Sequence, residues 1–308
     1  MGSGRLKDQF GDRFNQGQPA WSGEKGGECL IGGVKQFGEH EVREVSAGGY
    51  ELSKGGVVVG SFRSGRIDPD RVVFPLGHGT RLEVSNQGTR EILAPEKAML
   101  GGLIASDGGN HFYCRHDKKT GRYVCYYTTR FASEDRGLME LFDSLFEAVY
   151  DKTPGHYGSE NMRKGYISSK GVFYDLSDID IKTGPDEFRV PREHLDHAGK
   201  QAYLTGFFSG DGNVSVCRRG GRVGYMVRVY SSCREGLEGV RDLFLDLGFH
   251  PHEIHDEIRV RETRTETYFT FSIPTEEHPR FIHEIGSYNS EHRKKFEDME
   301  RRAGRDYE

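Results

Sequence analysis

The sequence lacks long hydrophobic runs and has few cysteines. No segment approaches the ~20 apolar residues that a membrane-spanning helix requires, so we expect no membrane association. The opening residues MGSGRLKDQFGDRF contain no apolar core of the kind found in secretory signals. The five cysteines are scattered without a C-x-x-C pair, which argues against a disulfide scaffold or zinc ribbon and favours a reducing compartment. We therefore expect a protein that is not secreted and works in the cytoplasm or on the nucleoid.

The chain also lacks an overall excess of positive charge. Its 43 basic and 48 acidic residues give a net charge of −5, so the total alone does not indicate a nucleic-acid binder. Glycine is abundant, with 42 of 308 residues. Residues 1–26 are polar and Gly-rich, which predicts a flexible leader. Residues 27–94 contain short β-branched runs broken by glycine, which predict a small β-rich unit.

Residues 95–303 contain an internal repeat. Two apolar runs, at 98–106 and 202–210, each end in Asp-Gly, and each is followed by a strand, a basic turn, a second strand and an amphipathic helix. We expect a further strand pair in each half, 164–167 with 172–176 and 257–261 with 267–273. The repeat predicts one domain with two α/β halves, 95–196 and 199–303.

The two apolar runs carry small residues at matching positions. Gly102 and Ser106 share one helix face in the first run, and Gly206 and Gly210 do so in the second. Small residues at this spacing let two helices pack closely, which would bring the next residues, the two aspartates, together.

Asp107 and Asp211 are the candidate catalytic residues. Two adjacent carboxylates repel and each raises the pKa of the other unless a cation lies between them. Oxygen ligands suit Mg²⁺, and such sites support attack of water on a phosphodiester. The alternative is that both aspartates simply end their helices before a glycine.

Basic residues concentrate in the predicted strands, whereas the predicted helix at 134–151 is acidic. A sheet with a basic face and acidic helices behind it can bind phosphates, and two-stranded ribbons fit the DNA major groove. The alternative is an ordinary solvated charged surface. The expected DNA-binding residues are Arg115, Lys118, Lys119, Arg122 and Arg130 in the first half, and Arg218, Arg219, Arg222 and Arg228 in the second.

The segments LGGLIASDG at 100–108 and LTGFFSGDG at 204–212 resemble the two signature motifs of single-chain LAGLIDADG homing endonucleases. The stretch FIHEIGSYN at 281–289, followed by RKKF at 293–296, is similar to the C-terminal part of that family. The resemblance covers about residues 95–303. It implies an α/β (α+β) fold in which a pseudo-twofold αββαββα repeat forms a saddle on a long double-stranded DNA target, as a monomer.

The resemblance also implies an activity. The last acid of each motif, Asp107 or Asp211, would bind the catalytic metal, with the backbone carbonyls of Ser106 and Gly210 contributing. The reaction would be cleavage of both DNA strands with Mg²⁺ or another divalent cation such as Mn²⁺, leaving 3′ overhangs. The first acid of the signature is replaced by Ala105 and Ser209. Family members usually place a basic or polar side chain beside the metals, for which Arg130 and Arg228 are the candidates.

Two further alternatives stay open. One is a nucleic-acid-binding module that does not cleave, either an intron RNA maturase or a DNA-binding regulator; the presence of both acids favours the enzyme. The other is an intein-derived fragment, because CLIGGV at 29–34 resembles the start of a splicing domain. The chain has no terminal His-Asn, so we expect no splicing. Residues 27–94 therefore have three alternative interpretations: a degenerate remnant of a splicing domain, an accessory module that contacts DNA, or a small β domain with no separate activity.

Overall fold

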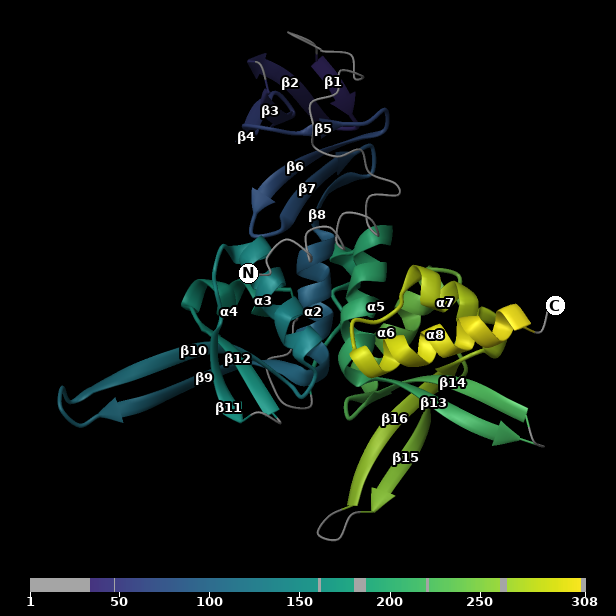
Figure 1. The fold of residues 1–308 in the computed structure, drawn as a ribbon. Helices are drawn as coiled ribbons and strands as arrows, with labels where there is room; N and C mark the ends of the chain where they lie inside the picture. The colour runs from purple at the N-terminus through teal and green to yellow at the C-terminus, as the bar shows by residue number, and fades with distance from the viewer. Residues whose placement is uncertain are drawn as a thin grey trace, which may run out of the picture.

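The computed structural model describes residues 34–305 except 47, 160–161, 180–186, 220–221 and 261–264. The expected leader at 1–26 and the intein-like residues around Cys29 lie outside the described residues. Within the described part, a β-rich unit is followed by two α/β halves (Figure 1). The class expected from the sequence, mixed α and β with antiparallel sheets and a β-rich N-terminal unit, is confirmed.

The N-terminal unit consists of two four-stranded antiparallel sheets, each with its strands paired in chain order. Its strands are β1 (Val34–Phe37), β2 (His40–Ser46), β3 (Gly49–Lys54), β4 (Val57–Phe62), β5 (Arg66–Ile67), β6 (Arg71–Gly77), β7 (Thr80–Ser85) and β8 (Gly88–Leu93). The unit has its own core, which includes Phe37, Leu52 and Phe74. Figure 1 shows it beyond the N-terminal ends of the two central helices, away from the other sheets.

The two halves repeat one arrangement of elements. The first half contains α2 (Pro95–Asp107), β9 (Gly108–Asp117), β10 (Arg122–Ser133), α3 (Arg136–Tyr150), β11 (Gly155–Ser159), β12 (Met162–Ser168) and α4 (Lys170–Ser177). The second contains α5 (His197–Asp211), β13 (Gly212–Arg219), β14 (Arg222–Ser231), α6 (Arg234–Asp246), β15 (His255–Val260), β16 (Thr265–Ile273), α7 (His278–Glu284) and α8 (Ser290–Arg305). Both sheets are antiparallel with equivalent strand orders, β9-β10-β12-β11 and β13-β14-β16-β15. The two halves therefore share one ββαββ topology after each central helix.

The prediction of a strand at 172–176 is wrong. Residues 172–176 lie in α4, and the strand that pairs with β12 is β11, at 155–159. Ser169 caps α4 by accepting a hydrogen bond from the Val172 amide, and Val172 and Leu176 are buried one helical turn apart. The spacing of the two apolar residues is thus that of a helix face.

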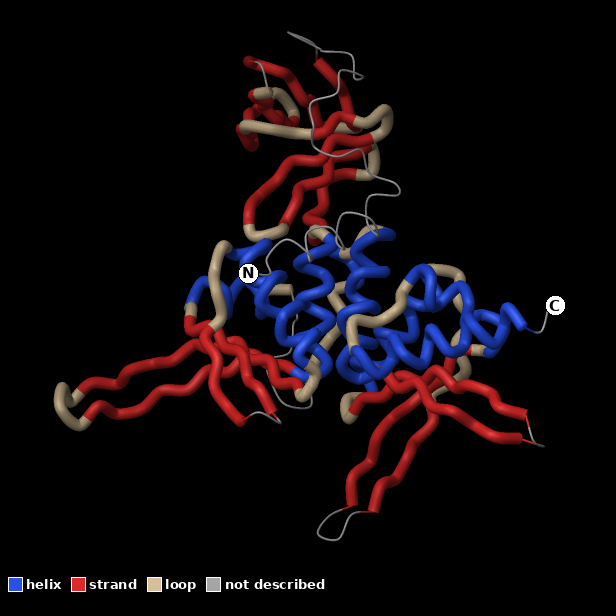
Figure 2. The backbone as a smooth tube through the Cα atoms, in the orientation of Figure 1, coloured by secondary structure: helices blue, strands red, loops and turns tan. Residues whose placement is uncertain are grey.

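The helices form a layer between the two sets of sheets (Figure 2). Helices α2 and α5 lie side by side at its centre, and every residue of α2 from Lys97 to Ser106 is buried. A helix that is apolar on all sides belongs in a core, and the buried residues of both halves form one continuous cluster around this pair. No helix in the described residues is long and apolar enough to cross a membrane.

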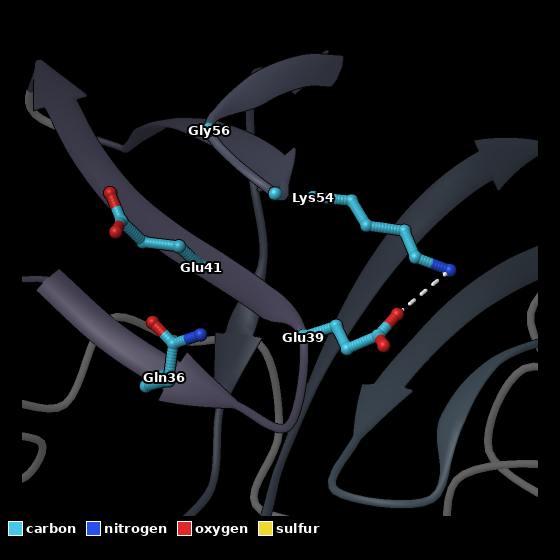
Figure 3. Close-up of a pocket in the computed structure, with 6 residues that line it drawn as sticks. Gln36, Glu39, Glu41, Lys54 and Gly56 are labelled. Atoms are coloured by element: carbon cyan, nitrogen blue, oxygen red, sulfur yellow. Dashed lines mark ion pairs between the residues drawn. The ribbon is translucent and has the colours of Figure 1, made fainter.

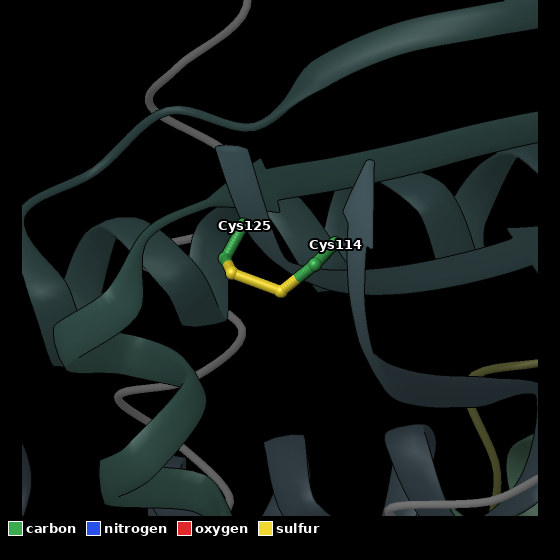
Figure 4. The surroundings of a disulfide bond; sticks show 2 residues. All are labelled: Cys114 and Cys125. Carbon is green, nitrogen blue, oxygen red and sulfur yellow. A yellow bond between two sulfur atoms is a disulfide. The ribbon is translucent and has the colours of Figure 1, made fainter. Parts of the chain in front are cut away.

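A disulfide joins Cys114 of β9 to Cys125 of β10 (Figure 4). The two residues are direct cross-strand partners, so the β9–β10 register brings them together. This pairing departs from the expectation drawn from scattered cysteines, because sequence spacing does not reveal register. Cys217 and Cys233 are free thiols.

A recess of about 470 Å³ in the N-terminal unit is lined by polar residues and glycines (Figure 3). An ion pair between Lys54 and Glu39, with an N–O distance of 3.3 Å, lies at its edge. The recess is lined by residues of β1, β2 and β3 and the turns beside them, which lie far from the C-terminal ends of α2 and α5 (Figure 1).

Candidate functional site

The central helices touch through their glycines. A Cβ built on Gly102 would stand 2.1 Å from the carbonyl oxygen of Tyr203, and one on Gly206 would stand 2.2 Å from that of Met99. Any larger side chain at either position would force the helices apart. The close approach expected from the small residues is therefore present in the structure.

The helix ends also meet. A Cβ on Gly210 would lie 2.2 Å from Ser106 Oγ and 2.9 Å from Asp107 Oδ2. The carboxylate of the first repeat thus lies against the residue just before Asp211. Asp107 is exposed and Asp211 is half-buried, and both lie where a central helix passes directly into the first strand of its sheet.

The donors at this junction suit a hard divalent cation. The carboxylates of Asp107 and Asp211 and the backbone carbonyls of Ser106 and Gly210, which the sequence predicts as ligands, would form an all-oxygen set. The described residues contain no group of three or more His, Cys, Asp or Glu side chains able to hold a metal.

Arg130 and Arg228 occupy equivalent positions in the two sheets. Arg130 is paired with Gly109 and Arg228 with Asn213, each two residues beyond the motif aspartate. The Nε of Arg130 is buried and has no hydrogen-bond partner among the described residues. Arg228 instead donates from NH1 to the Tyr230 hydroxyl at 3.1 Å. A buried guanidinium nitrogen without a hydrogen-bond partner costs free energy, so the two arginines have different surroundings.

Strand alternation decides which basic residues share a face with Arg130. We call the β9–β10 pair the first ribbon and the β13–β14 pair the second ribbon. Cross-strand partners point to the same face of a ribbon, and so does every second residue along a strand. Arg115 and Arg122 therefore lie on the same face of the first ribbon as Arg130. Lys118 and Lys119 lie in the turn between β9 and β10. The opposite face packs onto helix α3 through Phe131.

The second ribbon divides its arginines differently. Arg218 shares a face with the buried Val214, so it lies on the side opposite Arg228. Arg219 and Arg222 are paired at the end of the ribbon, and their side chains are outside the described part of the structure.

Aromatic side chains on the Arg130 face were missed in the sequence. Tyr113 and Tyr126 stack with ring centroids 5.0 Å apart, and the Arg115 guanidinium lies 5.1 Å from the Tyr126 ring. Tyr113 stands two residues before Arg115, so strand alternation could have placed both on one face. The equivalent positions in the second ribbon are Cys217 and Gly224, so the two faces differ chemically.

The second sheet carries acids on the same side as Arg228. Glu257 lies 3.9 Å from Arg228 NH1, and the Tyr268 hydroxyl donates to Glu266 at 3.1 Å. The charge of this face is therefore mixed, whereas the basic strands predicted a basic face.

The model of the LAGLIDADG-like domain family matches residues 198–297, which extend from the start of α5 into α8. None of the curated proteins compared matches the chain.

Similar solved structures include mesophilic variants of the homing endonuclease I-DmoI, at 18% identity over 62% of this chain and 95% of that chain, with a TM-score of 0.46. I-DmoI in complex with DNA and Mn is similar at 17% identity, over 62% and 96% of the two chains, with a TM-score of 0.42. The meganuclease I-SmaMI bound to uncleavable DNA is similar at 12% identity, over 67% and 87%, with a TM-score of 0.44.

Proposed function

We propose that this chain, a member of the LAGLIDADG family through its residues 198–297, is a site-specific endonuclease that cuts both strands of a long DNA target and leaves 3′ overhangs. The observation that carries the proposal is the contact of the two helix ends. Gly210 lies against the Asp107 carboxylate, so the acids of both repeats reach one junction between the two sheets.

Asp107 and Asp211 are the proposed catalytic residues and metal ligands, with the carbonyls of Ser106 and Gly210. A bound Mg²⁺ or Mn²⁺ would polarise the phosphodiester and activate water. Arg130 and Arg228 flank the two acids at equivalent register positions, where they can bind the phosphates on either side of the cut.

The DNA would lie across the sheet faces that carry Arg130 and Arg228, with the pseudo-twofold axis of the protein on the centre of the target. We assign residues 95–303 to this nuclease domain, with halves 95–196 and 199–303, and place its action in the cytoplasm or on the nucleoid. The described part of the β-rich unit, from residue 34 to 94, lies beyond the N-terminal ends of the central helices (Figure 1), so we assign it no contact with the same stretch of duplex.

The test is cleavage of DNA that carries the uninterrupted host locus, with Mg²⁺, Mn²⁺ or Ca²⁺ at equal concentration. We expect cutting of both strands with Mg²⁺ or Mn²⁺ at one site. Asp107→Asn and Asp211→Asn should each abolish cutting while DNA binding in a gel-shift assay persists. Asp151→Asn, an exposed residue with positive φ at the end of α3, is the matched control and should cut normally.

Two results would overturn the proposal. One is cutting by the Asp107→Asn/Asp211→Asn double variant at the wild-type rate. The other is a folded wild-type protein that cuts no DNA but binds intron RNA and speeds its splicing, which would make the chain a maturase.

A further inference from the structure

The segment between α7 and α8 holds the end of the second central helix. We name residues 285–292 the tail clasp. The Thr205 hydroxyl donates to the Ile285 carbonyl at 2.8 Å, and the Tyr288 amide donates to Ser209 Oγ at 2.9 Å. The clasp therefore contacts α5 at two residues one helical turn apart, Thr205 and Ser209, and the second lies two residues before Asp211.

Ser209 is the centre of these contacts. It is fully buried and donates to the Thr205 carbonyl at 2.7 Å, as helical serines often do. Its hydroxyl also accepts from Ser287 Oγ at 3.3 Å, and its backbone carbonyl accepts from Asn289 Nδ2 at 3.4 Å. A buried hydroxyl with this many partners fixes the backbone on which it stands.

His292 belongs to the same hydrogen-bond network and extends it to the residue that follows Asp211. Its Nδ1 lies 3.0 Å from Ser287 Oγ, and its ring packs against Phe208 with centroids 5.2 Å apart. The side chain also makes a hydrogen bond with the backbone of Gly212, the residue that follows Asp211. Residues on both sides of the second acid are thus tied to one buried network.

The clasp also reaches the first half of the chain. The Ser290 amide donates to Asp135 Oδ2 at 2.7 Å, while Oδ1 of the same carboxylate accepts from Gly137 at 2.7 Å and caps α3. The segment that positions the second helix end is therefore anchored to both halves.

The first motif has a different residue at the position of Ser209. Ala105 stands at the position of Ser209, and a methyl group neither donates nor accepts a hydrogen bond. The two helix ends are thus held by different contacts, although Asp107 and Asp211 occupy equivalent positions, as do Arg130 and Arg228.

We propose that Ser209, Ser287 and His292 are positioning residues for Asp211, and that the tail clasp sets the cutting rate of one DNA strand only. The inference rests on the proposed function. The two strands of a duplex are related by a dyad, as the two acids are by the pseudo-twofold axis, so each acid serves one strand more closely. Loosening one acid should therefore slow one strand.

The experiment uses the full chain with two substrates: a supercoiled plasmid that carries the target site, and a linear duplex of the same site with a different label at the 5′ end of each strand. For Ser209→Ala and His292→Gln, we expect nicked circles to accumulate, with one strand slowed about 10- to 100-fold. The other strand and the affinity for DNA should stay close to wild type. Asn289→Ser removes the amide donor to the Ser209 carbonyl but keeps a neutral oxygen able to cap α8, so it is the mild variant if the others fold poorly.

The matched control is Ser177→Ala. Ser177 donates to a carbonyl one turn back in its own helix, as Ser209 does, but it lies at the end of α4 away from the clasp. It should cut both strands at wild-type rates.

A readout independent of activity is amide hydrogen exchange. Ser209→Ala should raise exchange in residues 209–213 more than in residues 105–109, which contact Gly210. Equal slowing of both strands, or unchanged exchange at 209–213, would overturn the inference while the proposed function stands. A wild-type chain that cuts neither strand would overturn both.

Discussion

Gly210 lies in direct contact with Asp107, although more than a hundred residues separate them. The Cα of Gly210 faces the Asp107 carboxylate so closely that a Cβ would stand 2.9 Å from Oδ2. The contact places the acid of one repeat beside the backbone of the other. The geometry of the proposed metal site therefore requires glycine, which has no Cβ, at position 210.

Gly210→Ala should consequently damage cleavage more than folding. The new methyl group would push on Ser106 and the Asp107 carboxylate, and displacement of a catalytic group by about 1 Å can cost about 100-fold in rate. Single-turnover cleavage and thermal melting measure the two effects. Gly171→Ala is the control, because a Cβ there meets nothing within 4 Å. Wild-type cleavage by Gly210→Ala would contradict this view of the site.

Gly206→Ala tests the helix contact itself. Its Cβ would stand 2.2 Å from a backbone carbonyl of the facing helix, which cannot rotate away as a side chain can. Overpacking of this kind costs about 1–3 kcal/mol of unfolding free energy, or more. Urea unfolding of Gly206→Ala should show that loss, whereas Gly171→Ala should be neutral or stabilising. An unchanged midpoint for Gly206→Ala would mean that the helices are not held at this separation.

The sequence predicts the central features because they depend on local signals that occur twice. Asp-Gly after an apolar run, with small residues one turn apart, requires no knowledge of tertiary contacts. Features that depend on strand register were not predictable in this way. The Cys114–Cys125 disulfide and the location of Arg218 on the far face both follow from which residues pair across a ribbon. The tail clasp involves contacts between residues about 80 positions apart, and no periodicity indicates them.

The buried Lys97 provides a test of stability away from the proposed site. Its side chain is 1% exposed, and its Nζ lies 2.7 Å from Asp175 Oδ2 and 2.9 Å from Thr80 Oγ1. Asp175→Asn would leave this ammonium buried without a counter-charge, at a cost of about 3 kcal/mol. The exposed Lys294–Glu291 pair offers the control, and Glu291→Gln should change the unfolding midpoint little. Equal effects of the two substitutions would show that burial of Lys97 does not matter.

Acid should destabilise the fold through His292. Burial, aided by nearby Lys295, lowers the pKa of His292 to about 4, although Asp135, Glu291 and the hydrogen bond to Gly212 act in the opposite direction. The unfolded chain binds this proton near pH 6.5, whereas the native state binds it only near pH 4. The unfolding free energy should therefore fall as pH drops from about 6.5 to about 4, by at most about 1.4 kcal/mol per pH unit from this residue.

Urea unfolding at intervals of pH measures this slope, and His292→Gln should reduce it. The slope should not vanish, because burial also lowers the pKa of His278. An identical slope for the variant and the wild type would show that His292 is not neutral in the native state.

The ribbon faces make a prediction about salt. Arg122 lies on the Arg130 face and Arg218 lies on the face opposite Arg228, yet both are exposed arginines near the ends of equivalent ribbons. If DNA lies on the face with Arg130 and Arg228, Arg122→Ala removes a phosphate contact and Arg218→Ala does not. Each lost phosphate contact lowers the slope of log affinity against log salt by about 1. Fluorescence anisotropy with labelled target DNA measures both slopes, at salt concentrations from about 50 to about 200 mM. A reduced slope for Arg218→Ala with an unchanged one for Arg122→Ala would place the DNA on the helix side of the ribbons.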